Sequence, residues 1–145
     1  MTELRVFYRI AVIRLSRKKA MNPADHHVVV LGATAKPARY ANQAIRLLKE
    51  KGYTHITPVH PRLAESEGIP VTNRLRDIGS PVDTLTLYVG PARLEPMVDD
   101  IARLKPGRVI FNPGTESPAL QRALDEAGIP WEEACTLVLL RTGQF

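Results

Sequence analysis

Two kinds of segment alternate along the chain from His26 onward. Short apolar runs rich in β-branched residues predict strands, and longer runs with apolar residues three or four positions apart predict helices. The predicted strands are Val28–Leu31, His55–Val59, Thr84–Val89, Arg108–Phe111 and Ile129–Glu132. The predicted helices are Ala41–Lys51, a helix from Pro91 to about Leu104, and Glu116–Ala127. A short segment at Val71 and a small helix near Asn73–Ile78 lie between the second and third strands, and an apolar segment, Cys135–Leu140, ends the pattern.

This order predicts an α/β fold. Alternating strands and helices form a parallel sheet that helices cover on both faces, and the crossovers are right-handed. Val28–Leu31 is apolar throughout, as expected for a central strand that is buried on both sides. We therefore expect one three-layer domain with a mostly parallel sheet of five to six strands.

Length and charge indicate one folded unit with a basic N-terminal extension. The chain has 145 residues, a suitable size for a single core, and a formal net charge of +5. Residues 1–25 hold six basic and two acidic side chains, whereas residues 26–145 hold 14 basic and 13 acidic ones. The excess positive charge thus lies in the extension. Since a nucleic-acid-binding domain needs a basic face on its folded body, we expect no nucleic-acid partner.

The extension is open to several interpretations. Its arginines and scarce acids fit an amphipathic presequence or a helix on a membrane surface. We favour a poorly ordered extension, with Met21 as a possible start of translation. No apolar run approaches the roughly 20 residues that span a bilayer. The single cysteine, Cys135, cannot form an internal disulfide, and the four histidines lack zinc-site spacing, so we expect a cytoplasmic protein without a metal.

Candidate ligand-binding residues follow the predicted strands. In an open α/β sheet, ligands bind beyond the carboxyl ends of the strands, where the strand order reverses. Gly32 allows the backbone to approach a ligand closely, and the N-terminus of the next helix attracts phosphate. Thr34 adds a hydroxyl group, and Lys36 and Arg39 add positive charge. Alternatively, Gly32 only turns the chain, and Lys36 and Arg39 are solvated surface residues without a ligand.

The strand ends argue against a standard NAD site. The G-x-G-x-x-G fingerprint keeps only Gly32, because positions 34 and 37 are threonine and proline. An NAD site also has an acidic residue after the second strand, where this chain has His60, Pro61 and Arg62. Cationic groups suit a phosphorylated ribose, such as the 3′-phosphate of coenzyme A (CoA) or the 2′-phosphate of NADP. Alternatively, His60 and Arg62 are ordinary surface residues that bind no phosphate.

Four segments together resemble a known family. They are VVVLGATAKPARYANQAIRLLKEKGY, ITPVHPR, VDTLTLYVGPARLEPMVDDI and VIFNPGTES. The resemblance is to the small bacterial CoA-binding proteins, which are single Rossmann-like domains similar to the N-terminal domain of the succinyl-CoA ligase alpha subunit. It covers 26–145. It implies a binder of CoA or an acyl-CoA, with the nucleotide lying across the strand ends.

The resemblance also implies roles for most candidate residues. Gly32, Ala33 and Thr34 would cradle the pyrophosphate, and Pro37, Arg39 and Tyr40 would close over it. His60, at a position where the family commonly has asparagine, would lie by the adenosine and its 3′-phosphate with Pro61 and Arg62. Tyr88, Gly90 and Pro91 would line the opposite side. Asn112, Gly114 and Thr115 would point toward the pantetheine.

No catalytic set emerges from the sequence. Glu116 is explained by the preference of acidic residues for a helix N-terminus. Cys135 is either a thiol that could pair with CoA or, as we favour, a small buried residue. We therefore favour a binding module. An NAD(P)-dependent oxidoreductase or redox sensor is the alternative, and a third is an interaction domain that has lost its ligand. A protein partner or a homodimer stays open.

Overall fold

The computed structural model describes residues 22–145, so the interpretations of residues 1–20 and of Met21 concern residues outside the described part. A 3-10 turn, η1 (Pro23–Asp25), precedes a five-stranded sheet in which all neighbouring strands are parallel. The sheet order is β2-β1-β5-β6-β7. The strands are β1 (Val28–Leu31), β2 (Ile56–Val59), β5 (Thr84–Leu87), β6 (Arg108–Phe111) and β7 (Trp131–Glu133).

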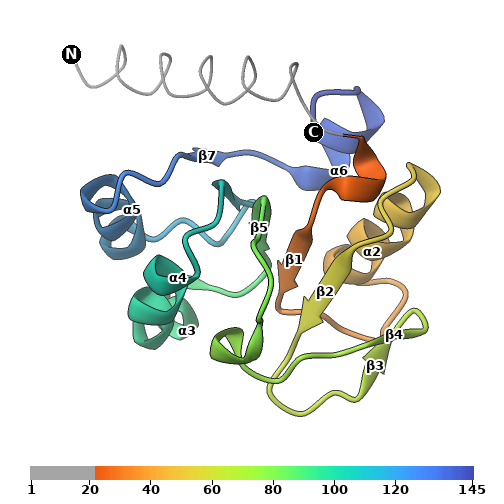
Figure 1. The fold of residues 1–145 in the computed structure, drawn as a ribbon, viewed down its shortest axis with the longest axis horizontal. Coiled ribbons are helices and arrows are strands. Elements are labelled where there is room, and N and C mark those ends of the chain that lie inside the picture. Colours follow the sequence, from red (N-terminus) through yellow and green to blue (C-terminus); the bar gives the residue numbers. More distant parts are fainter. Residues whose placement is uncertain (1–21) are drawn as a thin grey trace.

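Helices cover both faces of this sheet (Figure 1). On one face lie α2 (Tyr40–Glu50) and α6 (Thr136–Arg141), and on the other lie α3 (Pro91–Leu94), α4 (Val98–Leu104) and α5 (Pro118–Glu126). Side chains alternate along β1, so that Val28 and Val30 pack beneath α2 and α6 while Val29 and Leu31 pack beneath the other helices. The predicted three-layer α/β fold is confirmed. None of the helices in residues 22–145 has the length and apolar character needed to cross a membrane.

Several element boundaries differ from the prediction. The helix expected from Pro91 to Leu104 is split into α3, the 3-10 turn η3 (Glu95–Met97) and α4. Pro96 explains the break, because proline lacks an N–H group and clashes with the carbonyl group four residues earlier. The helix α5 begins two residues later than predicted, because the Ser117 hydroxyl caps it by accepting a hydrogen bond from the Leu120 N–H. The apolar segment Cys135–Leu140 forms α6, so the sheet has five strands.

A small hairpin lies beside α2 and β2. Its strands are β3 (Glu65–Ser66) and β4 (Ile69–Pro70), and the 3-10 turn η2 (Leu75–Asp77) follows. The two residues between the strands, Glu67 and Gly68, have φ values of 51° and 76°, as a type I′ turn requires. Sequence patterns predicted only a loop here, since two-residue strands are too short for periodicity to reveal.

The strand order places the point where the topology reverses between β1 and β5. From β1 the chain crosses to β2 on one side, then returns past β1 to β5 on the other side. Both crossovers leave a crevice beyond the carboxyl ends of β1 and β5, which is where open α/β sheets bind ligands. The alternation of strands and helices alone did not determine which strand pair this would be.

Candidate functional site

The turn after β1 is packed directly against the end of β5. Gly32 has a φ of 95°, and a Cβ atom at this position would lie 2.8 Å from the Tyr88 carbonyl oxygen. The N–H groups of Gly32 and Ala33 both donate to the Val59 carbonyl oxygen, each at 3.0 Å. These two donors are therefore engaged with β2, and the backbone donors that can reach a ligand belong to the residues that follow.

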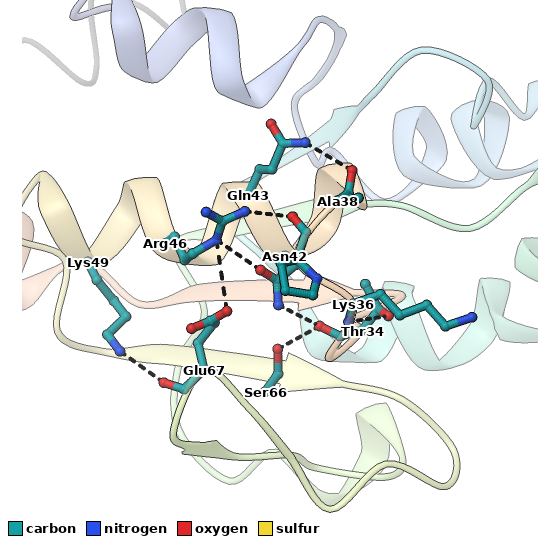
Figure 2. Close-up of polar contacts among 10 residues, drawn as sticks. Thr34, Lys36, Ala38, Asn42, Gln43, Arg46, Lys49, Ser66 and Glu67 are labelled. Atoms are coloured by element: carbon teal, nitrogen blue, oxygen red, sulfur yellow. Dashed lines mark hydrogen bonds and ion pairs between the residues drawn. The ribbon is translucent and has the colours of Figure 1, made fainter.

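The loop that follows, Thr34–Arg39, is tied to α2 and to the hairpin (Figure 2). The Thr34 carbonyl oxygen accepts hydrogen bonds from Asn42 Nδ2 at 3.0 Å and from Ser66 Oγ at 2.9 Å. Arg46 donates to Asn42 Oδ1 at 2.9 Å and to the Pro37 carbonyl oxygen at 2.6 Å. The loop is thus held from behind by side chains while its outer side is exposed from Ala35 to Tyr40.

The N-terminus of α2 faces this loop without a side-chain cap. Its N-cap residue is Arg39, and among residues 22–145 no side chain accepts a hydrogen bond from the first N–H groups of the helix, those of Tyr40, Ala41 and Asn42. Together with the helix dipole they favour an anion at this end. The exposed side chains of Lys36 and Arg39 add positive charge beside it. Tyr40, which is 70% exposed, lies at the same end of the helix.

At the end of β2, the His60 ring forms part of a turn. Its Nδ1 atom accepts hydrogen bonds from the N–H groups of Arg62 and Leu63, both at 3.1 Å, so the ring proton of a neutral His60 is on Nε2. An asparagine side-chain oxygen forms the same kind of turn. The His60 ring thus closes the turn that an asparagine side chain could also close. Arg62 is exposed beside the ring, and Pro61 lies between them.

At the end of β5, Tyr88 lies at the rim of the core between the sheet, α2 and α6. Its hydroxyl group is buried and has no hydrogen-bond partner among the described residues. Burial raises the pKa of Tyr88 to about 12, although the nearby hydroxyl groups of Thr136 and Thr86 act in the opposite direction. The phenol is therefore neutral at physiological pH. Gly90 is the N-cap residue of α3 and Pro91 is its first residue, where proline is well tolerated.

At the end of β6, Asn112 and Thr115 are used inside the protein. Asn112 is 3% exposed, and its Nδ2 donates to Thr86 Oγ1 at 2.7 Å and to the Leu87 carbonyl oxygen at 2.8 Å. Its Oδ1 accepts from the N–H of Thr136 at the start of α6. The buried Thr115 hydroxyl donates to the Asn112 carbonyl oxygen. These groups brace the site, and their direct contact with a ligand stays a prediction.

Gly114 is exposed in the same loop, and Glu116 explains its conformation. The Gly114 N–H donates to the Glu116 carboxylate, 2.9 Å from Oε2 and 3.2 Å from Oε1. Glu116 thus precedes the N-cap of α5 and closes a loop, whereas we expected it inside the first helical turn. Cys135 is partly exposed at the N-cap of α6.

All the sequence-predicted site residues follow β1, β2, β5 and β6. Since these strands are parallel, their carboxyl ends, and therefore these residues, share one edge of the sheet. Sequence reasoning missed Asn42, Arg46 and Ser66. Asn42 could have been found from the sequence, because it is a polar residue on the apolar side of α2, one turn before Ile45. In residues 22–145 no group of three or more His, Cys, Asp or Glu side chains is arranged to hold a metal ion.

Comparisons with known proteins place the chain in a family. A solved structure described as an uncharacterized protein is 41% identical, with a TM-score of 0.78, and the match covers 83% of this chain and 98% of that one. A protein from Thermus thermophilus is 32% identical, with a TM-score of 0.75, over 86% of this chain and 100% of that one.

A larger enzyme shares the fold. The dinucleotide forming acetyl-coenzyme A synthetase 1 of Ca. Korarchaeum cryptofilum, solved in complex with phosphate and ADP, is 20% identical with a TM-score of 0.67. The match covers 82% of this chain but 27% of that one. No curated protein matches the chain. The family model described as a CoA binding domain matches residues 26–141, and the chain therefore belongs to the CoA binding domain family.

Proposed function

We propose that this protein binds CoA or an acyl-CoA across the carboxyl ends of β1 and β5, as a binding module rather than as an enzyme. The observation that carries the proposal is the uncapped N-terminus of α2, which follows an exposed loop at the topological switch point. Membership of the CoA binding domain family supports CoA as the general ligand class.

The site would hold the ligand by its phosphate groups. The pyrophosphate lies against Thr34, Lys36, Arg39 and the first N–H groups of α2, while Gly32 and Ala33 hold the turn in place and Pro37 shapes the loop. The adenosine lies toward His60 and Pro61, and Arg62 pairs with the 3′-phosphate. Tyr40 is placed to cover the nucleotide. Gly90 and Pro91 line the side opposite the loop, and Gly114 lies toward the pantetheine arm.

NADP is the competing ligand. Arg62 follows β2 in the place where an NAD-binding domain has an acidic residue, and an arginine there is compatible with a 2′-phosphate. A nicotinamide site would make the protein an oxidoreductase or a redox sensor. The two ligands differ in the position of the ribose phosphate, so they can be distinguished by affinity.

Native mass spectrometry of the gently purified protein is the direct test, followed by calorimetric titration with CoA, dephospho-CoA and NADP. We expect a retained mass equal to CoA or an acyl-CoA and the highest affinity for CoA. Retained NADP, or tighter binding of NADP than of CoA, would replace the proposal with the redox one. A protein that binds none of the three at near-millimolar concentration would refute both and favour an interaction domain.

A further inference from the structure

We propose that Asn42 and Ser66 are positioning residues that direct the backbone N–H of Ala35 at a phosphate group of the ligand. This inference rests on the proposed function, because it assigns that N–H to the phosphate site. Neither residue belongs to the loop itself: Asn42 lies in the first turn of α2, and Ser66 ends β3, 31 positions after Ala35 in the sequence. The tertiary structure brings both to the same carbonyl group (Figure 2).

The peptide group that joins Thr34 to Ala35 is held in one orientation. Its carbonyl oxygen accepts two hydrogen bonds, from Asn42 Nδ2 at 3.0 Å and from Ser66 Oγ at 2.9 Å. Two donors use both lone pairs of the oxygen. No peptide bond in residues 22–145 is cis, and in a planar trans peptide the N–H points opposite to the C=O. The Ala35 N–H must therefore point away from the Asn42 amide and the Ser66 hydroxyl group.

Burial makes this orientation costly to change. Asn42 is 0% exposed and Ser66 is 1% exposed. If the peptide group rotated, both side chains would lose their acceptor where water cannot replace it, which is unfavourable for buried polar groups. Ala35 and Lys36 are both exposed, and in Figure 2 the Lys36 side chain extends away from Asn42 and Ser66. The directed N–H and a positive charge thus face the same solvent-accessible region.

Arg46 determines which end of the Asn42 amide faces Thr34. A guanidinium group only donates hydrogen bonds, so its Nε, 2.9 Å away, must meet the Asn42 oxygen. The amide nitrogen is then left for the Thr34 carbonyl. Arg46 Nη2 also donates to the Pro37 carbonyl oxygen, which directs the Ala38 N–H away from the Arg46 guanidinium group by the same peptide geometry. The helix α2 therefore orients two loop peptides from one face.

The hairpin is held where Ser66 is needed. Glu67 adopts a left-handed conformation, with φ at 51°, which is uncommon for a residue other than glycine. Its carbonyl oxygen accepts a hydrogen bond from Lys49 Nζ at 2.9 Å, and its carboxylate lies 3.8 Å from Arg46 Nε. These two contacts fasten the turn to α2. They place the neighbouring Ser66 hydroxyl against the loop.

The experiment combines an orientation measurement with two affinities. Residual dipolar couplings of the unliganded protein report the direction of the Ala35 N–H, and calorimetry measures binding of CoA and of inorganic pyrophosphate. The variants are Ser66→Ala and Asn42→Leu, with Ser66→Thr as the variant that keeps the hydroxyl group. Ser117→Ala is the matched control, because it also removes a buried hydroxyl hydrogen bond, at the start of α5 and away from the loop.

We expect the wild-type Ala35 coupling to agree with the structure and to change in Ser66→Ala and Asn42→Leu. Both variants should bind CoA and pyrophosphate about tenfold more weakly, the value of one hydrogen bond to a charged group. Ser66→Thr should restore the affinity to within about twofold, and Ser117→Ala should lower stability while leaving both affinities within the same limit. If Asn42 and Ser66 had only a structural role, Ser66→Ala, Asn42→Leu and Ser117→Ala would all lower stability. Their affinities for CoA and pyrophosphate would then equal those of the wild type.

Failure of this inference is distinguishable from failure of the proposed function. A wild-type protein that binds no CoA overturns the proposed function. A wild-type protein that binds CoA while Ser66→Ala binds it equally well overturns the positioning role alone. An unchanged Ala35 coupling in Ser66→Ala also overturns it, even if Asn42→Leu does not fold.

Discussion

Gly32→Ala is the substitution whose cost can be worked out most directly from the structure. The φ of 95° is unfavourable for any L-residue, at about 1–2 kcal/mol. The new Cβ would also lie 2.8 Å from the Tyr88 carbonyl oxygen and 2.8 Å from Val89 Cγ1. The Tyr88 backbone cannot retreat freely, since its N–H donates to the Leu31 carbonyl oxygen at 2.8 Å. Overpacking of this kind costs about 1–3 kcal/mol, which brings the expected loss to about 2–5 kcal/mol.

Other glycines of this chain separate the two contributions. Gly68 has a φ of 76° but open space around it, so Gly68→Ala should cost only the backbone strain, about 1–2 kcal/mol. At Gly107, where φ is not positive, a Cβ would lie 2.8 Å from the Asp83 carbonyl oxygen, so Gly107→Ala should cost only the overpacking. At Gly79 neither applies, and Gly79→Ala should change the free energy of unfolding by no more than about 0.5–1 kcal/mol.

Urea denaturation followed by circular dichroism measures all four variants. A loss of 2–5 kcal/mol corresponds to a midpoint lowered by about 1–3 M. The total stability of a domain, about 5–15 kcal/mol, leaves a folded population to measure. If Gly32→Ala is no more costly than Gly68→Ala or Gly107→Ala alone, strain and contact do not act together at this turn. The close packing of the end of β1 against β5 would then be refuted.

Three further predictions concern the ligand and pH. Thr34→Asp should lower the affinity for CoA at least a hundredfold, because like charges placed together cost several kcal/mol; calorimetry measures this, and unchanged affinity would rule out a phosphate at this loop. Arg62→Ala should weaken binding of CoA more than binding of dephospho-CoA, and equal losses would place the 3′-phosphate elsewhere. His27 is buried, and burial foremost, followed by the stacked ring of His55, lowers its pKa below 6.5, with the hydrogen bond to the Pro81 carbonyl acting in the opposite direction. Below about pH 6.5 the unfolded chain therefore binds a proton at His27 more readily than the folded protein does. The free energy of unfolding should then fall as the pH drops, by at most about 1.4 kcal/mol per pH unit from this group. His27→Asn should reduce that slope between pH 7 and 5.5 in urea titrations, whatever its effect on total stability, and an equal slope would contradict the assignment.

The sequence by itself determined the fold class and the residues that gather at one edge of the sheet. The sequence shows local signals, such as the apolar run Val28–Leu31 and the periodic pattern of α2. When strands and helices alternate, their apolar faces are all buried if the strands form a parallel sheet between two layers of helices. Because parallel strands end at the same edge, Gly32, His60, Gly90 and Gly114 could be grouped without a structure.

The tertiary structure alone decided how those residues are used. The strand order that makes β1 and β5 the switch point depends on which apolar faces pack best, and no local pattern records it. Asn112 is buried and donates a hydrogen bond to the end of β5, and Asn42 and Ser66 meet at the Thr34 carbonyl oxygen. The His60 ring closes a turn with the backbone that follows it. These contacts join residues that are distant in sequence, or residues that the sequence pattern does not distinguish from an ordinary loop. The physical reason is that a hydrogen bond between side chain and backbone depends on positions within a few tenths of an ångström. Residue order specifies such positions only through the packing of the whole domain.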